Sequence, residues 1–425
     1  MSSTTYFSFL RENRDFRRLW FAHLISLGGD WFNSVALLGL VLALTGSAFY
    51  ASAVLAANML PHFLVSPVAG VVVDRFDRRK LMIASDVLRA VLALGMLLVR
   101  SPSTVWIGIA CLAGIATLAA FFTPSSQAAI PNLVSPKELG RANVLMGSAW
   151  GAMLAIGAAL GGLVATVFGR DTAFIVNSAS FLVSALLIVS VRGRFSEDRP
   201  KTTSFHPIRD IGEGLSYAKS HGEVMALLAT KGGFGLGAGV IALVAIFGEQ
   251  VYRAGDLGIG ILFGARGLGA LAGPIMARAF VKDDKRKLFI AIGAAMALYG
   301  VAYAIFQSMP LLWLAAIFAT IAHLGGGAQW MMSTYGLQAI TPDHVRGRIF
   351  AFDFGLVTLT MSASLLIAGR LAELFDVRDV MLGLALIEIA YAGIWMIGSR
   401  RYWKKQPLPK GPEPEAAAQA QMTRK

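Results

Sequence analysis

Ionisable side chains that interrupt long apolar stretches are the residues of this sequence with the clearest capacity for chemistry. The run LGGDWFNS places Asp30 in the middle of the apolar segment 19–44, with Asn33 on the next helical turn. Asp86 and Arg89 stand three residues apart, a spacing that puts both on one face of a helix and allows a local ion pair. An ionisable group at the centre of a bilayer costs at least roughly 2.5 kcal/mol, so each needs a partner or a function. We expect Asp30 to carry a proton or contact a small molecule, with a structural hydrogen bond as the alternative. Asp86 and Arg89 are expected to form a structural pair.

Three further charged residues belong to such segments. Arg266 has no acidic neighbour in sequence, so it is expected to pair across helices with Asp30, with Glu249 or with an anionic group of a ligand, or to lie away from any cavity. Glu249 and Asp256 flank a predicted loop and are expected to be solvated, although Glu249 is near enough to a segment end to serve as a gate. Glu388 lies in the last apolar segment, a position often found at the periphery of a bundle, and is kept as a coupling candidate.

The segments that carry these residues are long and numerous. The chain has 425 residues, of which 56% are hydrophobic and 15% are charged, too little polar surface to enclose a soluble core. A helix needs about 20 apolar residues to cross a hydrocarbon core of about 30 Å. The sequence therefore predicts an all-α polytopic membrane protein with twelve transmembrane helices. The predicted spans are 19–44, 48–73, 81–99, 105–130, 143–168, 172–191, 224–247, 257–277, 288–306, 311–340, 349–371 and 380–397.

The basic residues test this layout, because they should gather on alternate loops. Of the 38 Lys and Arg residues, 30 lie on one side, which includes both tails. By the positive-inside rule this side is cytoplasmic, and we expect a bacterial inner (plasma) membrane protein with both termini in the cytoplasm. The net charge of +13 is spread over short loops, so topology explains it better than a nucleic-acid partner. The exceptions are Arg100, Arg170, Arg253, Arg370 and Arg378 on the other side, and Arg89, Lys231 and Arg266 within spans.

The sequence also contains an internal repeat. DRRKLM (77–82) matches DKRKLF (284–289) 207 residues later, and VSPKEL (134–139) matches ITPDHV (340–345) at an offset of 206. Six spans precede the repeat, so the two halves have the same orientation and are related by a pseudo-two-fold axis along the membrane normal, with a cavity expected between them. The predicted organisation is a tail (1–18), a first half (19–191), a linker with an amphipathic segment (192–223), a second half (224–401) and a disordered tail (402–425).

The loop after the second span carries a family resemblance. GVVVDRFDRRK (70–80) resembles the signature G-x-x-x-D-R-x-G-R-R/K of the major facilitator superfamily, with Asp77 in place of the second glycine. TPSSQAAIPNLVSPKELGRAN (123–143) and PDHVRGRIFA (342–351) look like the macrolide-efflux and enterobactin-exporter branch of that superfamily. The resemblance covers residues 16–401. It implies the major facilitator fold of two six-helix halves.

The resemblance implies a cytoplasmic latch. An acidic residue at a helix end, followed by clustered arginines, can pair with a neighbouring helix end and hold one gate closed. Asp74 is implied to face the start of span eleven and to stabilise the outward-open state, with Arg75 and Arg78 sharing the charge network. For Arg79 and Lys80 a purely topological role is the alternative. The predicted latch residues are Gly70, Asp74, Arg75, Asp77, Arg78, Arg79, Arg346, Arg348 and Asp353.

A small-residue motif lies in the fifth span. GAALGG (157–162) is similar to the end of the exporter motif G-P-x-x-G-G, with Ala158 in place of the proline. Gly157, Gly161 and Gly162 therefore form either a helix-packing surface or an antiporter motif, and both interpretations remain open.

Other function classes lack their motifs. The sequence has no phosphate-binding loop, nucleophile elbow, H-E-x-x-H motif or Cys/His cluster, so neither an enzyme nor a cofactor or metal site is expected. The resemblance implies a monomeric secondary active transporter that exports a small amphipathic or hydrophobic, drug-like or macrolide-like compound by proton antiport and alternating access. An uncoupled exporter or flippase of a siderophore or lipid-like compound is the runner-up, and an intramembrane enzyme or a channel is the alternative from a different class.

Overall fold

The computed structural model describes residues 3–135, 137–195, 207–282, 284–404 and 407–408. Within the helices, the side chains of residues 3–5, 66–67, 70–71, 74, 207–211, 213–214 and 343–344 also lie outside the description. The predicted latch residues Gly70 and Asp74 belong to this group. The predicted disorder of the tail falls largely on residues outside the described part of the chain.

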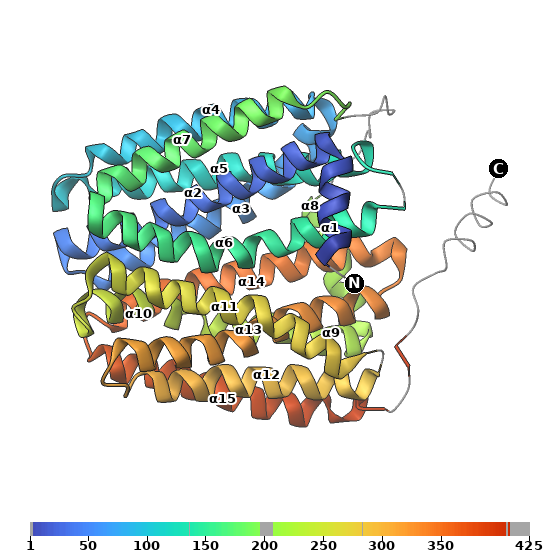
Figure 1. Cartoon of the computed structure of the whole chain (residues 1–425). Coiled ribbons are helices and arrows are strands. Elements are labelled where there is room, and N and C mark those ends of the chain that lie inside the picture. Colours follow the sequence, from blue (N-terminus) through green and yellow to red (C-terminus); the bar gives the residue numbers. More distant parts are fainter. Residues whose placement is uncertain (1–2, 136, 196–206, 283, 405–406, 409–425) are drawn as a thin grey trace.

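The described chain consists mainly of helices joined by short connections (Figure 1). Its helices are α1 (Ser3–Glu12), α2 (Arg14–Thr45), α3 (Ala48–Arg75), α4 (Arg78–Gly95), α5 (Val105–Ala129), α6 (Leu139–Phe168), α7 (Arg170–Ser190), α8 (Pro207–Ser220), α9 (Gly222–Gly237), α10 (Val240–Ile246), α11 (Gly255–Val281), α12 (Lys285–Phe306), α13 (Leu312–Ile340), α14 (Asp343–Leu371) and α15 (Val377–Ser399). Within the described residues, twelve helical segments are long and apolar enough to cross a membrane. The prediction of an all-α protein with twelve spans is confirmed.

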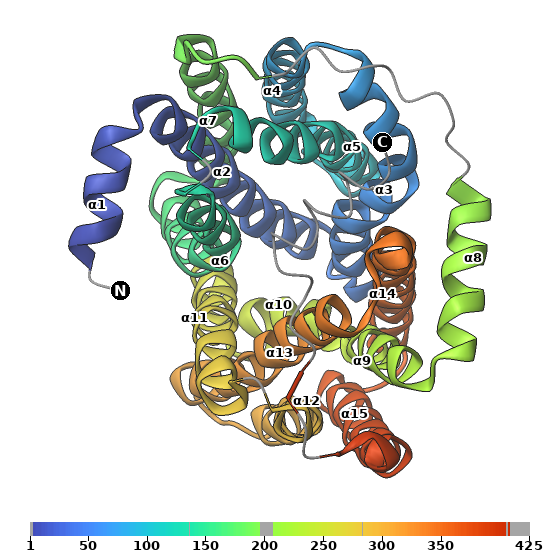
Figure 2. The same ribbon diagram turned by 90° about the vertical axis from the view of Figure 1, so that its right-hand side faces the viewer.

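Two groups of helices lie side by side in the bundle. Helices α2–α7 form the first half and α9–α15 the second, and the halves pack along two seams, α6 against α11 and α3 against α14 (Figures 1 and 2). Gly162 and Gly260 let α6 and α11 approach closely, because a Cβ built on Gly162 would lie 2.8 Å from the Cα of Gly260. Small residues at such a seam replace the hydrophobic driving force that lipid does not supply.

The buried apolar residues are distributed unequally between the two ends of the bundle. We call the end that carries α1 and the starts of α4 and α12 the basic end, and the other the opposite end. Toward the opposite end one cluster joins both halves, with Leu38 of α2 and Val244 of α10 among its members. Toward the basic end each half has its own cluster of described side chains, around Phe16 in the first and Phe289 in the second. The halves are thus fastened together mainly at the opposite end.

The seventh span is broken, whereas the sequence predicts one continuous span over 224–247. Helix α9 ends at Gly237, α10 begins at Val240, and a π-helical turn follows over Phe247–Val251. The glycine-rich run GGFGLGAG has a low helix propensity, which favours a break there. Ser364 of α14 satisfies the freed backbone groups: its Oγ accepts from the N–H of Gly239 at 2.9 Å and donates to the carbonyl of Leu236 at 2.5 Å.

Candidate functional site

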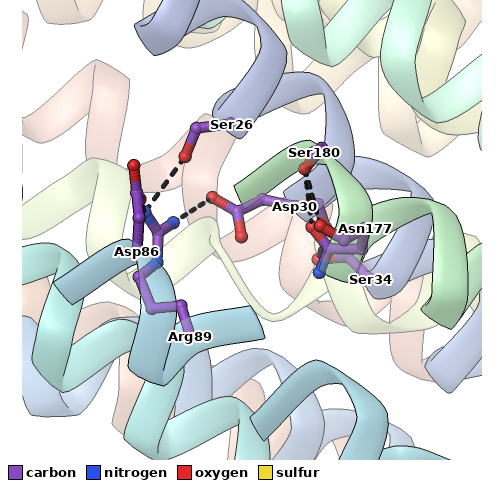
Figure 3. A network of polar contacts seen from close by, with 7 residues as sticks. All are labelled: Ser26, Asp30, Ser34, Asp86, Arg89, Asn177 and Ser180. Carbon is purple, nitrogen blue, oxygen red and sulfur yellow. Dashed lines mark hydrogen bonds and ion pairs between the residues drawn. The ribbon is translucent and has the colours of Figure 1, made fainter. Parts of the chain in front are cut away.

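The first half contains a buried network in which one arginine contacts two carboxylates (Figure 3). Arg89 on α4 lies 2.7 Å from Asp30 of α2 and 3.1 Å from Asp86 on its own helix. Its Nη1 also donates to Ser26 Oγ at 3.0 Å. Arg89 and Asp86 are fully enclosed, whereas the Asp30 side chain keeps 24% of its surface exposed. With both carboxylates ionised the network carries one net negative charge, and its accessible member is Asp30.

Local sequence explains how α4 presents this pair. Asp77 caps the start of the helix by accepting the N–H of Lys80 at 2.9 Å, which satisfies one of the unpaired donors of the first turn. The helix then brings Asp86 and Arg89 to one face. The residue that departs from the family signature therefore sets the beginning of the helix that holds the arginine.

Aromatic rings complete the burial of the arginine. The guanidinium carbon of Arg89 lies 4.0 Å from the ring centre of Phe181 and 5.7 Å from that of Phe122. The ring of His23 stacks on Phe122 at 6.4 Å. Cation–π contacts of this kind gain strength where water is excluded, so these rings hold the guanidinium in place between the two carboxylates.

The two polar residues on the turn after Asp30, Asn33 and Ser34, have different surroundings. The Ser34 hydroxyl donates a hydrogen bond to the backbone carbonyl of Asp30 at 2.8 Å. Asn33 is fully buried, and neither atom of its amide has a hydrogen-bond partner. Asn33 therefore lies inside the first half and does not line an accessible surface, although Asp30 does reach one.

A cavity of about 650 Å³ lies between helices of both halves. Its walls come from α3 and α5 of the first half and from α14 of the second, and they consist of His62, Ala120, Thr123, Pro124, Gln127, Ala128 and Phe354. Thr123 of this wall follows Phe122, whose ring centre lies 5.7 Å from the guanidinium carbon of Arg89, so the cavity lies near the charged network. A single histidine within an apolar segment gives no sign of a site in the sequence, and only the fold makes His62 part of a cavity wall.

The second half holds an ion pair that the sequence does not predict. Lys231 of α9 and Asp353 of α14 lie 3.3 Å apart, and both are almost fully buried. Lys231 Nζ also donates to Thr334 at 3.2 Å and lies 3.7 Å from the ring centre of Trp330. Asp353, one of the predicted latch residues, is thus paired with Lys231 of its own half. The sequence does contain a signal for this pair. The predicted span 224–247 carries Lys231 and the predicted span 349–371 carries Asp353, two charges of opposite sign inside apolar segments.

Arg266 has partners other than the expected ones. Its Nε donates to Nε2 of His323 on α13 at 2.9 Å, and the hydroxyl of Tyr303 lies 2.9 Å from the same nitrogen. The guanidinium stacks on Phe263 at 4.5 Å and its Nη1 has no partner. Neither Asp30 nor Glu249 forms an ion pair with it. Arg266 is therefore enclosed within the second half.

Polar contacts join the two halves at the opposite end. Arg170 at the start of α7 forms an ion pair with Asp256 at the start of α11, 2.8 Å apart. Ser47 Oγ donates to Glu373 at 2.5 Å. Asp256 is buried, so its expected exposure to solvent is wrong. Glu249 is half-buried within the electrostatic reach of Arg170, which keeps it a candidate for a gate.

Two arginines of the signature, at the basic end, bind the backbone of the segment that follows α7. Arg78 donates to the carbonyls of Ala128 and Phe195 at 3.0 and 3.2 Å, and Arg79 donates to Gly193 at 2.7 Å. The sequence does not predict this anchoring of residues 193–195. Arg75 is exposed, Arg346 donates to the carbonyl of Thr341 at 3.0 Å, and Arg348 is partly buried. The latch through Asp74 remains a prediction, because the side chain of Asp74 lies outside the description.

The three glycines of the fifth span face two different neighbours. A Cβ on Gly157 would lie 3.1 Å from Trp31 Cβ, and one on Gly161 would lie 2.7 Å from the Cα of Phe32, so both face α2. Gly162 faces α11 of the other half. All three are packing contacts in this structure.

The fold and the site together define a class. A bundle of two six-helix halves, with a cavity between them and charged residues buried beside it, is the architecture of a polytopic membrane transporter. A family model described as "Transmembrane secretion effector" matches residues 4–423, and the chain belongs to this family of the major facilitator superfamily. It is a family of transporters, not of enzymes.

Relatives and solved structures agree with this assignment. The chain is 27% identical over 389 residues to the multidrug efflux pump Tap of Mycobacterium tuberculosis (strain ATCC 25618 / H37Rv), covering 86% of this chain and 89% of that protein. It is 23% identical over 372 residues to macrolide efflux protein A of Streptococcus pyogenes, covering 85% and 90%. A POT family transporter in complex with a thioalcohol conjugated peptide has a TM-score of 0.74 at 11% identity, covering 92% and 97%. A bacterial homolog of the human lysosomal transporter Spinster, inward-facing and unoccupied, has a TM-score of 0.68 at 14% identity, covering 94% and 98%.

Proposed function

We propose that the chain is a secondary active exporter that moves a small amphipathic or hydrophobic compound out of the cytoplasm in exchange for protons. The observation that carries this proposal is the network of Asp30, Arg89 and Asp86. It combines an accessible carboxylate with a buried cation, and ionisable groups at membrane depth are typical of proton pathways. No nucleotide-binding loop occurs in the sequence, so an ion gradient is the available source of energy.

The cavity and the relatives support the substrate class. A volume of about 650 Å³ falls in the range of roughly 300–1,000 Å³ that suits a drug-sized ligand. Its walls are mainly apolar, with His62, Thr123 and Gln127 as polar contacts. One relative is a multidrug efflux pump and another a macrolide efflux protein. These findings support a hydrophobic or amphipathic substrate, and the negative charge of Asp30 suits one that carries an amine.

The distribution of basic residues supports the orientation. The basic end holds most of the Lys and Arg residues, and the positive-inside rule places it in the cytoplasm of a bacterial inner membrane. The halves 19–191 and 224–401 then move as two bodies of a monomer, joined by the linker 192–223. The contact between Arg170 and Asp256 joins the halves at the opposite end, which is the periplasmic side in this proposed orientation. An outward-open state requires that contact to break and the predicted latch of Asp74 to form.

The network suggests how a proton exchanges with the substrate. When Asp30 is ionised, the guanidinium of Arg89 is shared between two carboxylates. When Asp30 takes up a proton, its O–H bond forms and Arg89 pairs with Asp86 alone. A substrate that binds at Asp30 displaces that proton to water, so the carboxylate serves one ligand or the other. Competition at one carboxylate is a sufficient basis for antiport.

Proteoliposomes with an imposed pH gradient test the proposal. Wild-type protein is expected to accumulate ethidium or erythromycin against its gradient and to release protons when the probe is added. Asp30→Asn is expected to abolish gradient-driven accumulation and to leave downhill exchange measurable. Asp379→Asn, which removes an exposed carboxyl, is the matched control and should behave as wild type. Gradient-driven accumulation at the wild-type rate in Asp30→Asn would exclude Asp30 from coupling, and transport without proton movement in the wild type would exclude antiport.

A further inference from the structure

Glu388 on α15 is a carboxyl that the proposed cycle does not use and that the fold encloses completely. Its side chain is fully buried, and neither of its oxygens has a hydrogen-bond partner. It also forms none of the ion pairs of the described residues. Its position in the last span suggests the bundle periphery, but α15 packs against α9 and α12, and the carboxyl points into that interface.

The carboxyl lies against the break in the seventh span. A Cβ built on Gly237, the last residue of α9, would lie 2.7 Å from Oε2 of Glu388. On α12, the ring centre of Tyr299 lies 5.8 Å from that of Phe234, one turn before the end of α9. The hydroxyl of Tyr299 is buried and also has no partner. Two unpartnered polar groups therefore flank the point at which the helix is interrupted.

The other titratable groups on the surrounding helices are engaged elsewhere. Arg266 of α11 and Tyr303 of α12 are joined through His323 of α13. On α15 itself, Tyr391 donates to the carbonyl of Ala229 at 2.7 Å. Lys231, two turns before the break on α9, is paired with Asp353. No cation or base of the described chain therefore contacts Glu388.

The internal repeat relates this site to the network of the first half. The offset of 207 residues brings Asp30 to Gly237 and Arg89 to Met296. In the first half the carboxyl of Asp30 on α2 pairs with Arg89 of α4. In the second half glycine stands at the position of Asp30 and methionine at that of Arg89, and the carboxyl beside Gly237 comes from α15. Each half thus holds a carboxyl at this place, but only the first supplies a cation for it.

The absence of partners determines the charge of Glu388 in this conformation. An ionised carboxylate without donors in a low-dielectric interior costs several kcal/mol, whereas the neutral acid does not. We propose that Glu388 is a second proton-carrying site of the transport cycle, loaded in this conformation and emptied when the seventh span rearranges at its break. On release, the O–H bond breaks, the electron pair stays on the carboxylate, and the proton passes to water admitted beside the break. The proposal rests on the proposed proton antiport.

Infrared spectroscopy tests the charge of Glu388 without any substrate. The wild type is expected to show the carbonyl stretch of a protonated carboxyl without hydrogen bonds, at the high-frequency edge of the carboxylic acid region. Glu388→Gln should lack that band, and Asp379→Asn should keep it. Because a buried amide can itself disturb packing, Glu388→Leu serves as a second variant, and we expect it to fold because the site offers no polar partner. A wild-type spectrum in which this band is missing, or in which the Glu388→Gln difference is a carboxylate band, overturns the proposal.

Counting protons tests the role of the site in transport. In proteoliposomes loaded with ethidium, the number of protons moved per dye molecule should fall to about half in Glu388→Gln, because one of two titrating carboxyls is lost. An unchanged ratio in Glu388→Gln, with coupled transport in the wild type, overturns this inference and leaves the proposed antiport standing. Dye transport without proton movement in the wild type contradicts the antiport itself, and the infrared band then shows separately whether Glu388 is loaded.

Discussion

Arg170 of α7 and Asp256 of α11 form an ion pair of 2.8 Å that joins the two halves at the opposite end of the bundle. Arg170 retains 23% side-chain exposure and Asp256 retains 8%, so the pair is intermediate between surface and buried pairs. Such a pair contributes on the order of 1–3 kcal/mol. In the proposed alternating-access cycle the pair breaks when this end opens, so it should stabilise the present conformation against the other.

Arg170→Ala should therefore favour opening of this end about tenfold or more. Spin labels at Ser103 and Ser308, placed on the two halves after Cys111→Ala, would report the change as a larger population of long distances. Arg100→Ala is the control, because Arg100 pairs with Asp171 within the first half at 2.8 Å and both are well exposed. Equal distance distributions for Arg170→Ala and Arg100→Ala would contradict a gating role for the inter-half pair.

Replacing the shared cation should destabilise the first half. Arg89→Met leaves Asp30 and Asp86 without their cation, and breaking a buried pair typically costs about 3–5 kcal/mol. Thermal unfolding of the purified protein in detergent should show a markedly lower midpoint. The triple variant Arg89→Met, Asp30→Asn, Asp86→Asn should recover most of this loss while remaining inactive in gradient-driven export. If Arg89→Met alone were as stable as the wild type, the network would contribute little to the free energy of unfolding.

The cap of α4 should be replaceable by the residue of the family signature. Asp77→Ala removes the acceptor for the N–H of Lys80 and should cost about 1 kcal/mol, whereas Asp77→Gly should cost only a few tenths. The comparison of the two unfolding midpoints checks this. If alanine and glycine were equally destabilising, the side chain would act through something other than the cap.

The contact between Ser47 and Glu373 should depend on pH. The Ser47 hydroxyl, and then Arg370, lower the pKa of Glu373 below its usual range. A depressed pKa means that the stabilisation is present above the ordinary glutamate pKa and is lost as the pH falls through the lowered value. The label pair at Ser103 and Ser308 should therefore show more opening as the pH falls below the ordinary glutamate pKa, and Glu373→Gln should reduce that pH dependence. An identical pH profile in Glu373→Gln would exclude this contact as its source.

Glycine at the seam between the halves should not tolerate a methyl group. A Cβ on Gly162 would lie 2.6 Å from the carbonyl oxygen of Asp256, so Gly162→Ala must separate α6 from α11 and should reduce transport strongly. Gly147→Ala on the same helix is the control, since a Cβ there meets nothing within 4 Å. Wild-type transport by Gly162→Ala would mean that the seam is looser than the structure indicates.

The sequence by itself determines the architecture of this protein. Apolar segments of membrane-spanning length, the alternation of basic loops and the repeat at 206–207 residues predict twelve helices in two similar halves. Lipid is a uniform solvent, so length and hydropathy alone report which segments it surrounds. The ion pair between Asp86 and Arg89 is also predictable from the sequence, because residues three apart on a helix lie on the same face within reach of each other.

Only the tertiary structure decides which distant charges meet. Arg89 reaches Asp30 across 59 positions, Lys231 reaches Asp353, and Arg170 reaches Asp256 in the other half. These pairs depend on the rotation, tilt and depth of each helix against its neighbours, which packing sets and local periodicity does not encode. The break before α10 belongs to the same group, because Ser364 of another helix stabilises it. Sequence thus placed charges in the membrane, and helix packing selected their partners.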